Sequence, residues 1–220
     1  MKLKKINEHL AQRLVELGKT EPSEILKDSF GMIKSGNDVV IIHDDTEIRE
    51  DVMIISVIQR LQKPYMLSPR ALVVVKDKEA VLRVHDKFQK YSKYTELRIF
   101  STHEKTDIDE DKNLISVGTD VLIGTPERLN EMFKVAGYDV NQLLMYVIDE
   151  ADDLLRKRYD TKLARISEAI GKVQRFYLAV AEYEKLESFV DRTMLDSYWF
   201  TQDEYEYDEE EDDFEDSEEE

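Results

Sequence analysis

Apolar residues follow two alternating patterns along the chain. Residues 5–17 carry apolar side chains at spacings of three and four, which predicts an amphipathic helix closed by Gly18. Residues 38–42 are instead continuously apolar after the first position. Such a short apolar run is typical of a strand that is buried on both faces of a parallel sheet.

The same two patterns alternate through the rest of the chain. They predict further strands at 71–75, 97–100, 120–123, 144–148 and 175–180, further helices at 22–34, 48–62, 77–92, 126–135 and 159–170, and a loop at 101–113. Alternating helices and strands favour an α/β fold: a parallel sheet of about six or more strands with helices on both faces. Ligands bind such sheets beyond the carboxyl ends of the strands, so chemistry is expected there.

Composition excludes several classes of protein. The chain has no cysteine, so it has no disulfide framework, no thiolate nucleophile and no cysteine-bound metal. Its apolar runs are too short to cross a membrane. Its basic N-terminus is followed by polar residues rather than by the apolar stretch of a signal peptide, so no signal peptide is expected. A cytoplasmic protein without a membrane partner is expected.

The acidic residues are concentrated at the C-terminus. Residues 203–220 contain no Lys or Arg, and they carry most of the net charge of −18. The chain therefore divides into a nearly neutral domain at 1–202 and an acidic tail that is expected to be disordered. The first expectation for the tail is solubility. The alternative is that it screens a basic face, its own or a partner's, and three aromatic residues within it are compatible with such an interaction: Tyr205, Tyr207 and Phe214.

Two motifs stand directly after predicted strands. Gly124-Thr-Pro-Glu-Arg-Leu129 follows the fourth strand, and Asp149, Glu150, Ala151 and Asp152 follow the fifth. Together they resemble the first RecA-like domain of the DEAD-box RNA helicases over roughly residues 5–200. The resemblance implies a RecA-like sheet, an ATP–Mg²⁺ site and contacts to single-stranded RNA.

The segment that matches the ATP-binding loop departs from this family. A P-loop needs glycines, a Lys for the phosphates and a Ser or Thr hydroxyl for Mg²⁺. Here the stretch has no glycine and would place four carboxylates around a polyphosphate. We therefore expect no bound cofactor at this degenerate loop: His43, Asp44, Asp45, Thr46, Glu47, Ile48, Arg49 and Glu50. ATP and Mg²⁺ are expected only if the chain is an active helicase.

The Asp-Glu-Ala-Asp element is then predicted to be vestigial, with no catalytic residue. In an active relative its first Asp would hold Mg²⁺ and its Glu would position water. Here Asp149 and Asp152 are expected to cap the following helix, where acidic groups suit the helix dipole. Asp149 remains a weak candidate for Mg²⁺, since carboxylates at a strand end can bind this ion.

The motifs that contact RNA in the family are partly kept. Thr125 and Arg128 match a Thr-Pro-Gly-Arg element, and Lys76 and Lys78 stand where a Pro-Thr-Arg-Glu element would be. The resemblance implies weak, salt-sensitive contacts to RNA phosphates without sequence readout. The alternative is that Arg128 and Lys78 are ordinary surface charges at helix starts.

Three functions remain open. The first is an ATP-independent, helicase-like binding or regulatory module that contacts RNA or an RNA–protein assembly. The second is an active ATP-dependent RNA helicase subunit completed by a second domain in trans, because no Lys or Arg after Arg192 could supply arginine fingers. The third is a protein-interaction scaffold without RNA binding. The residues favour the first, and enzyme activity is not expected.

Overall fold

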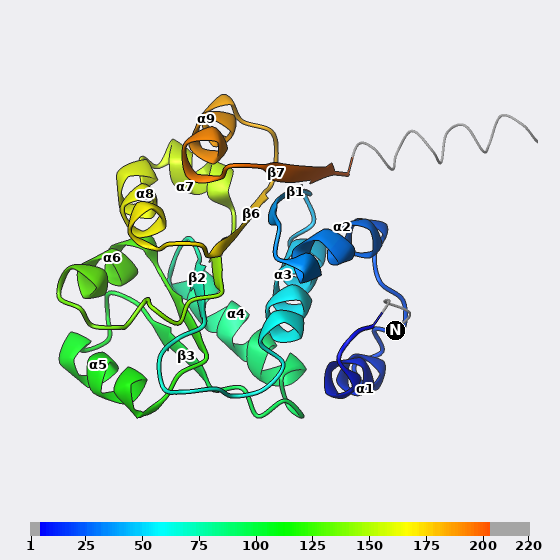
Figure 1. The fold of residues 1–220 in the computed structure, drawn as a ribbon, viewed down its shortest axis with the longest axis horizontal. Coiled ribbons are helices and arrows are strands. Elements are labelled where there is room, and N and C mark those ends of the chain that lie inside the picture. The colour runs from blue at the N-terminus through cyan, green and yellow to red at the C-terminus, as the bar shows by residue number, and fades with distance from the viewer. Residues whose placement is uncertain (1–4, 203–220) are drawn as a thin grey trace, which may run out of the picture.

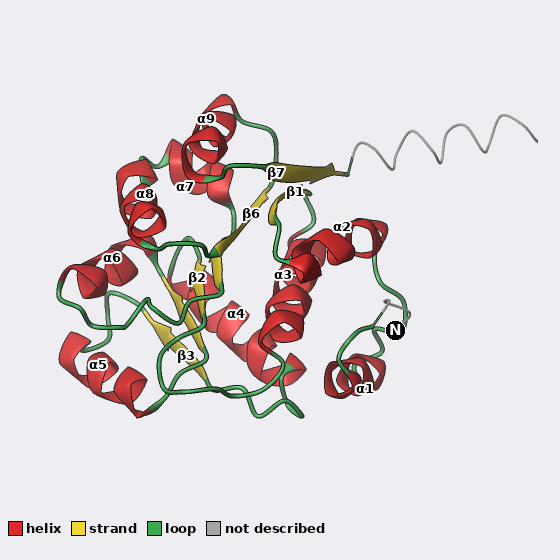
Figure 2. Ribbon diagram, viewed as in Figure 1, coloured by secondary structure: helices red, strands yellow, loops and turns green. Residues whose placement is uncertain are grey.

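The computed structural model describes residues 5–202 of the 220-residue chain. Helices and strands alternate along it (Figure 1, Figure 2). The helices are α1 (Glu8–Glu16), α2 (Glu24–Ser35), α3 (Thr46–Leu61), α4 (Lys78–Tyr91), α5 (Ile108–Val117), α6 (Pro126–Lys134), α7 (Ala151–Arg156), α8 (Asp160–Ala169) and α9 (Glu184–Thr193). The strands are β1 (Asp38–Ile42), β2 (Ala71–Val74), β3 (Ile99–Thr102), β4 (Val121–Gly124), β5 (Met145–Ile148), β6 (Gln174–Ala179) and β7 (Ser197–Thr201).

The strands of the described chain form one seven-stranded sheet in the order β3-β4-β2-β5-β6-β1-β7. Every pair of neighbours is parallel. Strand β1 lies between the last two strands of the sequence, with Val40 opposite both Tyr177 and Trp199. The carboxyl ends of all the strands therefore meet at one edge of the sheet.

Side-chain alternation along the strands produces two cores, one on each face of the sheet. Val39, Ile41 and Val73 point to a core shared with α1, α2, α3 and α4. Val40 and Val74 point to a second core shared with α5 to α9. These strands read as continuous apolar runs because both of their faces are covered by helices. The predicted RecA-like architecture, a parallel sheet with helices on both faces, is confirmed.

Residues 108–113 belong to helix α5, so the prediction of a loop over 101–113 is wrong there. Asp107 begins this helix by accepting hydrogen bonds from the amides of Asp109 and Glu110. Only Asp111 and Ile115 of the helix are buried. A helix with one buried apolar side chain leaves too weak a periodic pattern to detect, although its capping Asp and acidic first turn were readable signals.

Helix α7 is the helix that was expected to follow the Asp-Glu-Ala-Asp element, whereas α9 and β7 were not predicted. The aromatic residues at 198–200 do pack against the body, because they form the edge strand beside β1. The acidic segment 203–220 lies outside the described residues, so the division of the chain at residue 202 stays a prediction. Within residues 5–202, no helix combines the length and the apolar character needed to cross a membrane.

Candidate nucleotide and RNA site

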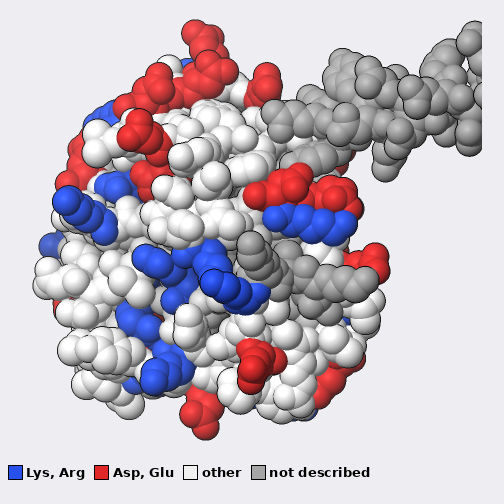
Figure 3. Space-filling view, turned by 45° about the vertical axis from the view of Figure 1, so that its right-hand side comes forward, with Lys and Arg blue, Asp and Glu red and all other residues white. Residues whose placement is uncertain are grey.

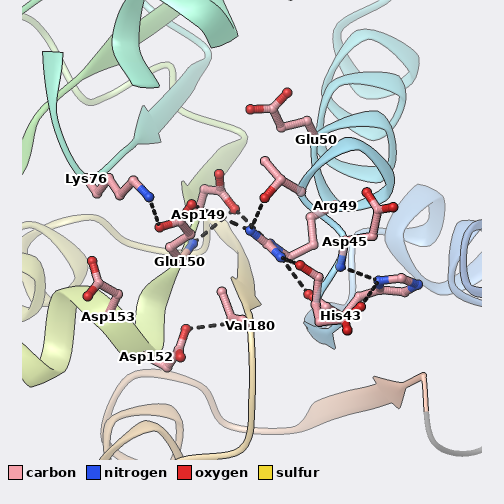
Figure 4. Close-up of polar contacts among 12 residues, drawn as sticks. His43, Asp45, Arg49, Glu50, Lys76, Asp149, Glu150, Asp152, Asp153 and Val180 are labelled. Carbon is pink, nitrogen blue, oxygen red and sulfur yellow. Dashed lines mark hydrogen bonds and ion pairs between the residues drawn. The ribbon is translucent and has the colours of Figure 1, made fainter. Parts of the chain in front are cut away.

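The family-like motifs meet at the carboxyl edge of the sheet (Figure 4). The β1–α3 loop (residues 43–45) follows β1, Lys76 follows β2, and Asp149 and Glu150 follow the neighbouring strand β5. The segment after β6 begins at Val180. The sequence therefore predicted correctly which segments come together, and the side chains decide what they can bind.

The β1–α3 loop satisfies its own backbone amides. The carboxylate of Asp45 accepts hydrogen bonds from two amides in the first turn of α3, at 2.7 and 3.1 Å. The amide of Asp44 donates to Oε1 of Gln202, which follows β7, at 2.7 Å. Six consecutive or nearly consecutive amides have an acceptor within the chain, namely those of His43, Asp44, Asp45, Glu47, Ile48 and Arg49.

Arg49 fills the centre of the site. Its guanidinium donates to the carbonyl oxygens of His43 and Asp44 at 2.7 and 2.8 Å. It also lies 3.7 Å from the carboxylate of Asp149 and 3.5 Å from that of Glu150. The side chain of Arg49 is 1% exposed. The loop thus surrounds a cation of its own chain and turns carbonyl oxygens toward it.

Two of the four carboxylates expected around a polyphosphate point elsewhere. Glu50 is 2% exposed and pairs with Arg83 at 2.7 Å and with Lys87 at 3.3 Å. Glu47 pairs with Lys19 and Lys87, which lowers its pKa to about 2 through hydrogen bonds from the two ammonium groups. Both turn toward α4 because basic residues there neutralise them, and the expectation of four clustered acids is wrong.

The Asp-Glu-Ala-Asp element does not cap the following helix, so the predicted capping role is wrong. Glu150 is the residue before α7; it adopts a left-handed backbone with φ 49°, and its side chain makes no capping bond. Asp149 faces Arg49 instead, and Glu150 pairs with Lys76 at 2.7 Å. Asp152 accepts the amide of Val180 at 3.0 Å, which ties the element to the segment after β6.

Burial is the main cause that raises the pKa of Asp149 to about 6; the nearby Glu150 and Glu50 act in the same direction, and Arg49 opposes them. The carboxylate is 2% exposed. Among residues 5–202, no group of three or more His, Asp or Glu side chains is arranged to hold a metal ion. Oδ1 of Asp149 accepts the amide of Glu150 at 3.0 Å and lies 3.7 Å from Nε of Arg49, and a cation so close is unfavourable for binding Mg²⁺.

Thr125 and Arg128, which match RNA-contacting residues of the family, are used inside the protein. Thr125 donates to the carboxylate of Glu104 and caps α6. Arg128 is 4% exposed, and it donates to the carbonyl oxygens of His103, at 3.0 Å, and Thr106. Arg128 is therefore neither a free RNA contact nor an ordinary surface charge, since it holds the 103–106 loop in place.

The two lysines of the predicted RNA face differ. Lys76 is engaged with Glu150, as described above. Lys78 begins α4 and makes no ion pair within the described residues, so it remains available at this edge. Lys105, on the adjacent loop, is exposed and is equally without an ion pair in residues 5–202.

Sequence reasoning missed the partners that occupy the site. Gln202 and Glu104 lie far along the chain from the groups they bind, and neither belongs to a motif. The only sequence signal for these contacts was the acidic character of Glu104, which follows the strand next to the one that precedes Thr125. The pairing of Arg49 with Asp149 was foreseeable only from opposite charges after two strands, β1 and β5, that end at the same edge of the sheet and are separated by β6.

Comparison with known proteins identifies the family. A model of the DEAD/DEAH box helicase family matches residues 51–184, well over half of the chain. The chain belongs to this family of helicase domains. The matched region includes the Asp149–Asp152 element and excludes the β1–α3 loop, in line with the loop's departure from the family pattern.

Curated relatives agree with this assignment. The chain is 22% identical over 162 residues to "ATP-dependent RNA helicase eIF4A" of Eremothecium gossypii, an alignment that covers 74% of this chain and 41% of that protein. It is 24% identical over 194 residues to "ATP-dependent RNA helicase DHH1" of Scheffersomyces stipitis, covering 88% and 38%. It is 25% identical over 190 residues to "ATP-dependent RNA helicase cgh-1" of Caenorhabditis elegans, covering 86% and 44%. The chain spans about two fifths of the length of these relatives.

Proposed function

We propose that this chain is an ATP-independent, helicase-like module that binds RNA or an RNA–protein assembly in RNA metabolism. The observation that carries the proposal is the contact of Arg49 with Asp149, Glu150 and two loop carbonyls. A role in RNA metabolism is favoured by the relatives, which are named as RNA helicases. A cytoplasmic location stays a prediction.

The residues present do not fit ATP. A polyphosphate is held by backbone N–H groups and a cationic side chain that reaches into an open loop. Here six amides of the loop and helix start already have acceptors, and the carboxylate of Asp45 stands where a phosphate would meet the start of α3. Its negative charge and that of Asp44 would repel a polyphosphate.

The residues also do not fit Mg²⁺. The ion would need Asp149 as an oxygen ligand, but that carboxylate is buried against Arg49. A hydroxyl ligand is missing as well, because Glu50 stands at the position of the family's Ser or Thr and points toward Arg83. No catalytic step through ATP or Mg²⁺ is therefore part of the proposal.

RNA binding is proposed through phosphate contacts from lysine and arginine side chains. Such contacts give weak, salt-dependent and sequence-independent binding. Lys76 and Arg128 serve internal contacts, so the proposed phosphate contacts come from basic side chains that are not engaged in this way. Binding of this kind requires no nucleotide, which distinguishes the module from the helicases it resembles.

The test measures RNA and nucleotide binding by the same protein. Fluorescently labelled single-stranded RNA is titrated with full-length protein at low and near-physiological salt, with and without ATP–Mg²⁺, and a fluorescent ATP analogue is titrated separately. We expect RNA binding that weakens steeply with salt, is unchanged by ATP–Mg²⁺ and accompanies no nucleotide binding. Nucleotide binding, or RNA binding that needs ATP, would overturn the proposal in favour of a helicase subunit. RNA binding at neither salt concentration would favour a protein scaffold.

A further inference from the structure

Four basic residues lie on segments that meet at the opposite edge of the sheet, where the strands begin. Lys34 ends α2 just before β1, and Arg60 and Lys63 stand at and beyond the end of α3. The guanidinium of Arg60 lies against Gly36, and Lys34 donates to the carbonyl oxygen of Lys5 at 2.7 Å. We call Lys5, Lys34, Arg60 and Lys63 the edge cluster.

The charges of Lys5, Arg60 and Lys63 are poorly neutralised within the described part of the chain. Lys5, Arg60 and Lys63 make no ion pair within residues 5–202, and Nε of Arg60 is buried without a hydrogen-bond partner there. The neighbouring Arg70, in contrast, is paired with Asp120 at 2.8 Å. Like charges held together repel one another and raise the local concentration of anions. The edge cluster is therefore suited to a polyanion.

An exposed apolar loop lies beside the edge cluster. Between α3 and β2, Tyr65, Met66 and Leu67 are each more than half exposed. The ring of Tyr65 stands 6.0 Å from the guanidinium carbon of Arg70, which holds it at the surface. Figure 3 shows Lys and Arg side chains gathered near the centre of one face of the molecule. Basic groups next to an exposed aromatic ring are the combination that binds single-stranded nucleic acid.

We propose that the edge cluster and Tyr65 form a binding surface for single-stranded RNA, with phosphates on the basic groups and a base stacked on Tyr65. The proposal rests on the proposed function in one respect, that RNA is the ligand. It moves the contact from the Thr125–Arg128 face, where the matching side chains serve internal contacts, to the edge where Lys5, Arg60 and Lys63 make no ion pair within residues 5–202. An acidic protein segment would satisfy the charges but would not need the ring of Tyr65.

The test compares two double substitutions that remove the same charge from exposed or half-buried lysines at opposite edges. Lys5→Gln/Lys63→Gln alters the edge cluster, and Lys78→Gln/Lys105→Gln alters the family-like face. Each full-length variant is titrated into a labelled 15-nucleotide oligouridylate at several salt concentrations. We expect the first variant to bind about tenfold more weakly and with a shallower salt dependence, and the second to change less than twofold.

Two further variants separate the possible explanations. Tyr65→Ala should weaken RNA binding about fivefold while leaving the binding of polyglutamate unchanged. Arg60→Gln should weaken RNA binding in the same direction, with thermal unfolding used to check that the fold is kept. A loss confined to Lys78→Gln/Lys105→Gln would overturn the edge surface while leaving the proposed function intact. No effect of Tyr65→Ala together with tight binding of polyglutamate would assign the surface to acidic proteins instead. If the unaltered protein does not bind the oligouridylate at low salt, both proposals fail.

Discussion

The guanidinium of Arg49 and the carboxylate of Asp149 face each other across two strand ends, 3.7 Å apart, and both are almost completely buried. Arg49 belongs to the first turn of α3, whereas Asp149 directly follows β5. Each group supplies the counter-charge that the other needs in a site with little water. This relationship links the loop after β1 directly to the Asp-Glu-Ala-Asp element.

Arg49→Ala should destabilise the protein strongly. Removing the guanidinium leaves the carboxylate of Asp149 without its cationic partner and leaves Glu150 paired with Lys76 alone. Removing one partner of a buried ion pair lowers the free energy of unfolding by about 3–5 kcal/mol. Urea unfolding at pH 7.5 measures the loss. Arg192→Ala is the matched control, because its pair with Glu168 is half exposed and should contribute less than about 1 kcal/mol. Equal losses for the two variants would contradict the role of Arg49.

The stability of the protein should respond to the titration of Asp149. Burial raises the pKa of this carboxyl to about 6, so the folded protein binds the proton more tightly than the unfolded chain does. The native state therefore gains stability from this group as the pH falls from 7.5 to 4.5. Relative to Asp149→Asn, which cannot titrate, the unaltered protein should gain on the order of 2–3 kcal/mol over that range. Parallel pH profiles for the two proteins would show that Asp149 titrates normally.

Arg49→Lys should not restore nucleotide binding. The substitution supplies the residue that the family uses, but the carboxylate of Asp45 still occupies the amides at the start of α3 and Gln202 still binds the amide of Asp44. Titration with a fluorescent ATP analogue should give no signal up to millimolar concentrations. Binding by this single variant would show that the loop amides open easily, and the unaltered protein serves as its reference.

Asp120 should be the most sensitive carboxylate outside the site. It is completely buried and accepts hydrogen bonds from Arg70, Arg98 and the amide of Tyr65. Burial works against the charged form, but these hydrogen bonds outweigh it and lower the pKa. Asp120→Ala should cost about 3–5 kcal/mol. Because the pKa is lowered, this stability is present above about pH 4, the ordinary pKa of Asp, and is lost only as the pH falls further.

The unfolding free energy of Asp120→Ala should therefore lie below that of the unaltered protein by a similar amount at pH 5 and at pH 7. Asp139→Ala is a suitable control, because Asp139 lies in an exposed loop and makes no ion pair within the described residues. A cost that disappears already at pH 5 would contradict a lowered pKa.

Arg128→Ala should loosen the 103–106 loop. The guanidinium donates to carbonyl oxygens of His103 and Thr106, and its removal leaves both without this donor. Hydrogen–deuterium exchange should become faster in residues 103–106 and stay unchanged in β1 and β6. A variant that keeps full protection in this loop but loses RNA binding would instead place Arg128 at an RNA contact. Lys134→Ala, at the end of the same helix, is the control.

The sequence predicted the sheet well because buried parallel strands have a distinctive signal. The run at 38–42 is apolar on both faces, and its bounds agree with those of β1. Strand β7 lacked this signal, since each of its residues is partly or largely exposed at the sheet edge. Helix α5 was missed for the same physical reason, because it presents mostly polar side chains to water.

The site was predicted in its location and less well in its contacts. The positions of Asp149 and Arg49 after predicted strands indicated that both lie at one edge of the sheet. They did not indicate that the two side chains pair with each other. Thr125 and Arg128 matched the family pattern, yet their partners come from the 103–106 loop, which has no motif of its own. Side-chain partners of this kind depend on the tertiary packing of segments that are distant in sequence.

The position of β1 in the sheet has a consequence for the order in which a nascent chain can fold. Its two neighbours, β6 and β7, follow the other described strands along the chain and therefore leave the ribosome after them. Until they emerge, the backbone of Val39 to Ile42 has no strand to pair with, and the bond from Asp44 to Gln202 must wait for 158 further residues. Strands β2, β3, β4 and β5 can pair earlier. The half of the sheet that carries Asp149 can therefore form before β1, which positions Arg49, has paired with its neighbours. The closed site is thus a late product of synthesis, set when the end of β7 reaches the β1–α3 loop.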